Sequence, residues 1–148
     1  MKTEVEKYLD DKKIPYTSLE FSERPSGEEE IPVFKTLVLK GNKTDTLVAL
    51  VPLNERVSYK KLAKITGNRK VGLPPIEYVL SVTGYPHGAN TPIGIHMHLP
   101  EVMIVADERI NQYESIVVSA GELGKGLSIK SQDLQELVQP VIASILND

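Results

Sequence analysis

The chain has 148 residues, 41% of them hydrophobic and 25% charged, which is the balance of one globular domain and excludes an intrinsically disordered chain. Its 20 acidic residues outnumber its 17 basic ones, giving a formal net charge of −3, which argues against a protein that binds nucleic acid tightly and without sequence preference, as many DNA binders do. There is no cysteine, so disulfides, a thiol nucleophile and a cysteine-based zinc site are excluded.

The N-terminal end of the chain is charged and lacks the apolar core of a signal peptide. No apolar run approaches the ~18–20 residues of a membrane span, so we expect a cytoplasmic protein without a membrane partner. Residues 3–12 are predicted to form an amphipathic helix that begins with a capping box at Thr3 and Glu6. An alternating strand over 16–21 and a polar, acidic loop over 22–30 follow.

Two β-rich runs, 33–40 and 46–53, flank a short polar turn and predict a hairpin. The second run is apolar on both faces, which is typical of a central strand. Beyond it we expect a helix over 56–66 with Ser58 as its N-cap, and a short strand at Val71.

The elements expected in the second half are a helix near 76–82, a loop to residue 94, strands over 96–99, 102–106, 115–120 and 127–129, a turn over 107–110, and a helix over 131–146 capped by Ser131. Helices and strands are interspersed without a regular βαβ rhythm, and no repeat or linker divides the chain. The sequence therefore predicts one α+β domain over residues 1–148 with a mixed sheet.

The loop S-V-T-G-Y-P-H-G-A-N-T-P-I-G at 81–94 contains three glycines and two prolines between apolar runs. Glycine allows close approach of a backbone or ligand, and proline stiffens the chain. Such a loop can hold backbone N–H groups toward a substrate oxygen, although an ordinary irregular turn has the same composition.

Three familiar sites are disfavoured. His96 and His98 would share one face of a strand, but the chain has only three histidines, and a zinc site needs three or four convergent ligands, so we predict no metal. No serine lies on a G-x-S-x-G nucleophile elbow. The glycines of the 81–94 loop are not followed by the G-K-[ST] of a phosphate-binding loop.

Lys35 stands inside the apolar run of residues 33–38. A lysine that lays its stem on the sheet surface explains this position, and so does a fixed positive donor to a substrate. The helix over 56–66 and the turn after it carry the one clear basic cluster, which is either a solvated helix face or a landing surface for phosphates. The basic residues of this cluster are Lys60, Lys61, Lys64, Arg69 and Lys70.

The run V-F-K-T-L-V at 33–38, followed by G-Y-x-x-G-x-x-x-P-x-G at 84–94, resembles the YbaK family, the aminoacyl-tRNA editing (deacylase) domains associated with prolyl-tRNA synthetase. The likeness extends over most of the chain and includes K-K-L-A-K-I-T-G-N-R-K-V at 60–71. It implies a barrel-like mixed sheet flanked by helices, no cofactor, and a free-standing hydrolase that removes a wrong amino acid from a tRNA 3′ end.

By this resemblance Lys35 orients the substrate, and the loop at Gly88 and Ala89 supplies N–H groups around the ester carbonyl. The residues implied to bind substrate are Phe21, Thr36, Gly84, Tyr85, Asn90, Thr91, Pro92 and Gly94. Thr36 after the lysine resembles the cysteine-editing branch, whose substrate is thought to attack its ester with its own thiol. The resemblance implies Cys-tRNA(Pro) as the substrate, with Ala-tRNA(Pro) as the alternative. It also implies prolyl-tRNA synthetase as a partner, and contact between the tRNA and the five residues of the basic cluster.

The chain also departs from the family pattern. The segment between Phe21 and Lys35 is short and acidic, where members usually carry a helix. The double glycine common in the loop is Gly88-Ala89, and Ser128 stands where an aspartate is frequent. A relative that binds tRNA or a synthetase without hydrolysis is therefore the rival interpretation.

Overall fold

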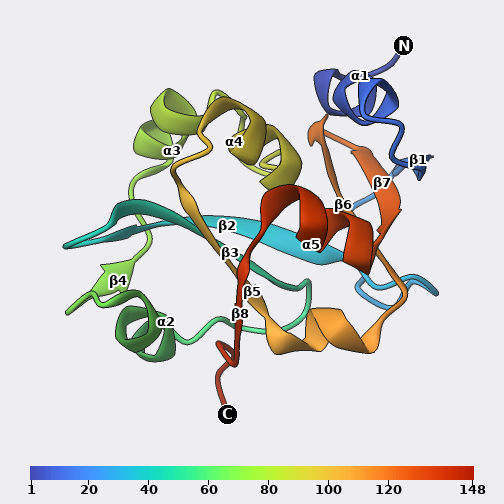
Figure 1. The fold of residues 1–148 in the computed structure, drawn as a ribbon. Coiled ribbons are helices and arrows are strands. Elements are labelled where there is room, and N and C mark those ends of the chain that lie inside the picture. The colour runs from blue at the N-terminus through green and yellow to red at the C-terminus, as the bar shows by residue number, and fades with distance from the viewer.

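The computed structural model describes residues 1–148 and contains two β-sheets with helices around them (Figure 1). A five-stranded mixed sheet has the strand order β4-β2-β3-β5-β8, and a three-stranded antiparallel sheet has the order β1-β7-β6. The strands are β1 Tyr16–Glu20, β2 Phe34–Gly41, β3 Asp45–Pro52, β4 Val71–Gly72, β5 Met103–Asp107, β6 Ser115–Glu122, β7 Lys125–Lys130 and β8 Val141–Ala143. The helices are α1 Glu4–Asp11, α2 Tyr59–Thr66, α3 Ile76–Thr83, α4 Pro92–His98 and α5 Ser131–Val138, with a 3-10 helix, η1, over Glu108–Gln112.

The two sheets meet where a parallel bridge joins Val33, just before β2, to Val117 of β6. The N–H of Val117 donates to the carbonyl of Pro32 at 2.9 Å and strengthens this junction. The sheets stay separate, so the arrangement is barrel-like without closing into one barrel. The α+β fold with a mixed sheet and flanking helices is as predicted.

The hairpin of β2 and β3 divides the interior into two hydrophobic cores. Phe34 and Leu50 belong to a cluster of 19 buried residues shared with α1, α4, α5 and the three-stranded sheet. Leu39 and Val51 belong to a cluster of 11 on the other face, under α2. The strand β3 is therefore buried on both faces and central, as its apolar sequence predicted.

Several helix and strand predictions are confirmed. Thr3 and Glu6 form the capping box of α1, with both reciprocal hydrogen bonds present. The hairpin pairs Phe34 with Pro52 and Gly41 with Asp45. Ser58 caps α2 as expected, although the helix itself begins at Tyr59 and not at residue 56.

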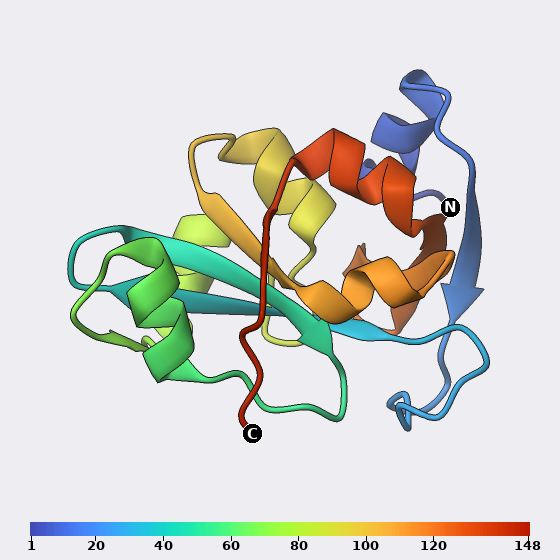
Figure 2. The ribbon, with the colours of Figure 1, turned by 60° about the horizontal axis from the view of Figure 1, so that its bottom comes forward.

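The helix predicted over 131–146 is wrong in its second half. It ends at Val138, Gln139 adopts a left-handed conformation with φ of 49°, and Pro140 cannot continue a helix. The chain then forms β8, parallel to β5, and crosses to the α2 side, where Leu146 bridges Val57 (Figure 2). Ser131 is the first helical residue and not a cap, and its hydroxyl donates to the carbonyl of Ile110 at 2.9 Å.

The strand predicted over 96–99 is also wrong, because residues 96–98 form the end of α4 and Leu99 is its C-cap. Thr91 caps this helix and Pro92 occupies its first turn, which are standard helix-start signals that the loop interpretation overlooked. His96 and His98 therefore do not share the face of a strand. The turn predicted over 107–110 is the start of η1.

Candidate active site

A cavity of about 780 Å³ opens between the first half of β2, the β6–β7 turn, the segment 21–25 and α3. Hydrophobic side chains make up 13 of its 28 lining residues, and the polar ones converge from separate parts of the chain. The predicted site residues that line it are Phe21, Lys35, Thr36, Tyr85, Gly88 and Asn90. A concave, largely apolar cavity with a few convergent polar groups is the usual form of a small-ligand site.

Lys35 reaches this cavity from β2, where it pairs with Val51 across the hairpin. Its side chain is partly buried and makes no hydrogen bond or ion pair within the protein. Burial lowers the pKa of Lys35 below its ordinary value, and the positive charges of Arg56 and Arg24 lower it further. A partly desolvated lysine that has no ion-pair partner within the protein is available for an anionic group of a ligand.

Thr36 follows Lys35 and lines the same cavity. Its hydroxyl oxygen is buried and has no hydrogen-bond partner, the one such side-chain atom in the protein. A buried, unpaired hydroxyl costs about 1–3 kcal/mol, so a bound polar group that pairs with it would gain that interaction.

The loop between α3 and α4 exposes its backbone at Gly88, which has φ of +92°. The backbone angle favours glycine at this position, and a Cβ added there would also lie only 3.3 Å from the Leu123 side chain. The N–H groups of Gly88 and Asn90 have no partner within the protein, and both residues line the cavity. They are available as donors to a substrate oxygen.

Ala89 is fully buried and does not line the cavity. Its N–H donates to the carbonyl of Pro86 at 2.9 Å, and its carbonyl accepts a hydrogen bond from the Ser119 hydroxyl at 2.9 Å. In this conformation the N–H of Ala89 is therefore engaged inside the loop, where it holds the neighbouring residues in place.

Asn90 is fixed by its side-chain oxygen, which accepts a hydrogen bond from the Thr83 hydroxyl at 2.8 Å. The amide nitrogen of Asn90 is left without a protein partner. The remaining predicted substrate-binding residues do not line the cavity and lie instead at the two ends of the loop. Gly84 ends α3 with φ of 76°. Thr91, Pro92 and Gly94 are buried at the start of α4.

Tyr85 fixes the loop to the N-terminal helix. Its hydroxyl donates to Glu4 Oε1 at 3.2 Å, and the same oxygen lies 2.6 Å from His98 Nε2. Burial, followed by the negative charge of Glu4, raises the pKa of Tyr85 well above its ordinary value. His98 thus pairs with a carboxylate, and the structure brings together no three side chains suited to hold a metal ion.

The five basic residues predicted to contact tRNA lie on α2 and the turn that follows it, outside the cavity lining. Lys61 is engaged at the C-terminal end of the chain, where its amine donates to the carbonyl of Leu146 at 2.8 Å and to Asp148 at 2.9 Å. The other four, which are Lys60, Lys64, Arg69 and Lys70, are exposed and form no ion pair.

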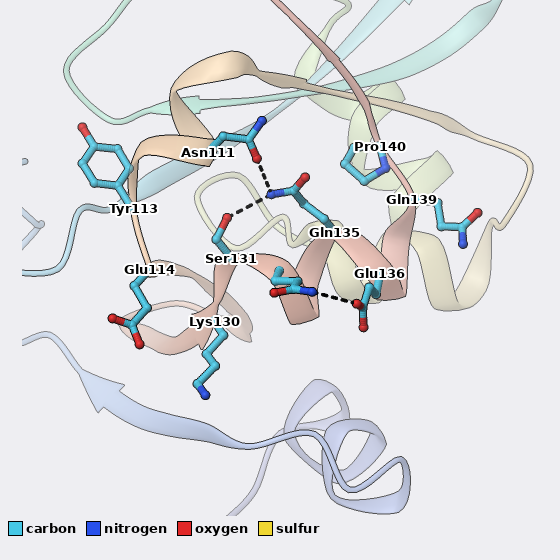
Figure 3. Close-up of a pocket in the computed structure, with 10 residues that line it drawn as sticks. Asn111, Tyr113, Glu114, Lys130, Ser131, Gln135, Glu136, Gln139 and Pro140 are labelled. Atoms are coloured by element: carbon cyan, nitrogen blue, oxygen red, sulfur yellow. Dashed lines mark hydrogen bonds between the residues drawn. The ribbon is translucent and has the colours of Figure 1, made fainter.

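A second, polar groove of about 920 Å³ runs along α5 and shares no residue with the first cavity (Figure 3). Its polar groups already pair with one another: Gln135 Nε2 donates to Asn111 at 3.0 Å and to Ser131 at 3.1 Å. It contains none of the predicted site residues, so the first cavity is the candidate active site.

Two features of this cavity escaped the sequence analysis. Arg24 lines it from the acidic loop, and Leu123 and Gly124 line it from the turn between β6 and β7. Arg24 is one of two cations in the segment 21–35, and this is only a weak sequence signal that it belongs to the site. Nothing in the sequence indicates that residues 123–124 lie near Gly88.

Comparison with known proteins shows the family to which the chain belongs. The family model of the aminoacyl-tRNA editing domain matches residues 17–137. The chain therefore belongs to the aminoacyl-tRNA editing domain family, and it is an enzyme of the editing class, an aminoacyl-tRNA deacylase. No helix has the length and hydrophobicity needed to cross a lipid bilayer.

Among individual relatives, EbsC of Enterococcus faecalis is 33% identical over 155 residues, covering 97% of this chain and 93% of that protein. Its name describes a candidate Cys-tRNA(Pro)/Cys-tRNA(Cys) deacylase. The crystal structure of a candidate trans-editing enzyme for prolyl-tRNA synthetase superposes with a TM-score of 0.81 at 21% identity, covering 97% of this chain and 95% of that one. A hypothetical protein, APE2540, superposes with a TM-score of 0.81 at 20% identity, covering 98% of this chain and 100% of that one. The two structures show a shared fold.

Proposed function

We propose that residues 1–148 form one domain, which hydrolyses the ester that joins cysteine to tRNA(Pro). The observation that carries this proposal is the convergence of Lys35, Thr36 and the free N–H groups of Gly88 and Asn90 on one cavity. The name of the Enterococcus relative supports cysteine as the amino acid. Prolyl-tRNA synthetase is the proposed partner and the cytoplasm the proposed place of action.

An editing site is needed because a synthetase pocket distinguishes amino acids of similar size by only ~1–3 kcal/mol. The ester is already activated, so positioning and electrostatics can supply most of the rate enhancement. In our proposal the substrate's own sulfur attacks the ester carbonyl carbon. The C–S bond forms, the ester C–O bond breaks, and the departing ribose oxygen takes up a proton. Water then opens the cyclic thioester to give free cysteine.

Each site residue has a proposed role in this reaction. Lys35 holds and orients the aminoacylated ribose with its positive charge, and Thr36 hydrogen-bonds the substrate through its unpaired hydroxyl. The N–H groups of Gly88 and Asn90 stabilise the negative charge that develops on the carbonyl oxygen. Ala89 contributes by holding this loop, since its own N–H is engaged. Phe21 and Tyr85 supply apolar walls.

The exposed cations Lys60, Lys64, Arg69 and Lys70 are proposed to attract the acceptor stem of the tRNA. Long-range attraction of this kind is screened by salt. A variant with all four changed to glutamine should lose activity on tRNA mainly through KM, and the loss should shrink as the salt concentration rises.

The proposal is tested by measuring hydrolysis of Cys-tRNA(Pro), Ala-tRNA(Pro) and Ser-tRNA(Pro) beside an uncatalysed control, with wild type and Lys35→Ala. Serine replaces the thiol by a hydroxyl, so rapid loss of cysteine alone supports attack by the substrate sulfur. Rapid hydrolysis of Ala-tRNA(Pro) instead would make alanine, and not cysteine, the amino acid that the enzyme removes. No acceleration of any ester, with tRNA still bound, would favour a non-catalytic tRNA-binding protein.

A further inference from the structure

The short loop over residues 22–30 brings a second cation to the cavity. Arg24 and Lys35 both line it, and neither side chain makes a hydrogen bond or an ion pair within the protein. Arg24 is exposed while Lys35 is partly buried, so the two side chains offer a positive surface from the cavity mouth inward.

This loop is held in a defined conformation by hydrogen bonds. The Glu29 carboxylate accepts from the N–H groups of Ser26 at 2.9 Å and Gly27 at 2.8 Å. Asn54, in the connection after β3, donates its amide to the carbonyl of Ser26 at 3.0 Å. Gly27 has φ of +88°, and a Cβ there would lie 2.1 Å from the Asn54 amide nitrogen. Arg24 therefore projects from an anchored loop, two residues from its attachment point.

Neither of the two cations has an ion-pair partner, although the charge of Glu55 partly offsets the lowering of the Lys35 pKa. Lys35 is close enough to Arg24 and Arg56 for both to disfavour its charged form. Glu55 is itself paired with Arg109 at 3.4 Å, and Glu122 at the cavity wall is paired with Lys125 at 3.2 Å. Glu23 is the one unpaired acid of the lining. Like charges in proximity raise the free energy of the empty site, and an anion relieves that repulsion.

We propose that Arg24, with the charge of Lys35 beside it, binds the phosphate group of the 3′-terminal nucleotide of the tRNA. A guanidinium group donates two parallel hydrogen bonds to phosphate oxygens, which a phosphate at the mouth of the cavity can accept. Lys35 deeper in the cavity then faces the aminoacylated ribose of the same nucleotide. Arg24 is thus a substrate-positioning residue, and this inference rests on the proposed editing function.

The experiment compares three cysteine esters: Cys-tRNA(Pro), cysteine esterified to the 3′ oxygen of adenosine 5′-monophosphate, and the same ester of adenosine without phosphate. Arg24→Gln is expected to lower kcat/KM about 10- to 100-fold on the two substrates that carry phosphate and to leave the adenosine ester unchanged. Arg24→Lys should recover part of the loss, since it restores charge without the guanidinium geometry. Glu23→Gln is the control in the same loop and should retain or increase activity.

An equal loss on all three esters would overturn the proposal in favour of a structural role for Arg24, and no loss on any would overturn it outright. A binding measurement keeps the test independent of catalysis. Wild type should bind adenosine 5′-monophosphate more tightly than adenosine, and Arg24→Gln should abolish the difference. If no ester is hydrolysed but this difference is present, the phosphate site stands while the proposed function fails; if the difference is absent from wild type, the phosphate site is wrong.

Discussion

The hydroxyl of Tyr85 donates a hydrogen bond to Glu4 at 3.2 Å and thereby joins the cavity loop to the first turn of α1. These residues are 81 positions apart in the chain. The ring of Tyr85 lines the cavity, while its polar end points to the carboxylate that also contacts His98. The N-terminal helix therefore takes part in positioning the candidate active site.

Removal of this link should affect activity more than stability. Tyr85→Phe is expected to cost about 1 kcal/mol of unfolding free energy and to lower kcat/KM for the aminoacyl-tRNA, because the loop loses its tie to α1. Tyr78→Phe is the matched control, since it loses a hydrogen bond of 2.6 Å to Thr46 and lies outside the cavity lining. Denaturant unfolding and deacylation rates of both variants check this; equal rates in the two would contradict it.

Gly94 is required by the same tyrosine. A Cβ at position 94 would lie 2.0 Å from the Tyr85 hydroxyl oxygen, so Gly94→Ala must displace the ring or the helix. We expect a loss of about 1–3 kcal/mol in unfolding free energy, as for other overpacked sites. Gly72→Ala is the control, because nothing lies within 4 Å of a Cβ there. Urea unfolding of both variants measures the difference, and comparable midpoints would refute the prediction.

Substitution of Thr36 should have opposite effects on the stability and the activity of the protein. Thr36→Val keeps the shape of the side chain and removes the buried, unpaired hydroxyl, so the unfolding free energy should stay the same or rise by about 1 kcal/mol. Deacylation should fall, because the substrate loses its partner. Thr36→Ser, which keeps the hydroxyl, should retain more activity than Thr36→Val. A valine variant as active as wild type would remove Thr36 from the site.

The lowered pKa of Lys35 predicts a dependence of stability on pH. Between that lowered pKa and the ordinary value of 10.5, the unfolded state binds more protons at this lysine than the folded state does. The penalty for burying the charge is therefore present at neutral pH and is relieved as the pH rises through this window. The unfolding free energy of wild type relative to Lys35→Met should rise as the pH increases from neutral toward 10.5. A constant difference would show that Lys35 is not desolvated in the folded protein.

Local patterns in the sequence predicted the elements whose signals lie within a few residues. The capping box at Thr3 and Glu6 and the β2–β3 hairpin follow from such short-range rules, and both formed as expected. Lys35 was identified as exceptional because a charge inside an apolar strand is rare enough to require an explanation. Pro140 is a local helix-ending signal as well, but the prediction followed the apolar spacing alone, so the predicted helix ran too far.

Only the tertiary structure decided which groups face the cavity and which are already engaged. Arg24 and Leu123 reach the site through a loop and a turn that contact Asn54 and Phe21, respectively, which are far away in the sequence. The N–H of Ala89 and that of Gly88 look equivalent in the sequence, yet one is bonded to Pro86 and the other is free. A side chain's neighbours along the chain determine its local conformation, whereas its hydrogen bonds, its exposure to water and its charged surroundings depend on segments brought together by folding.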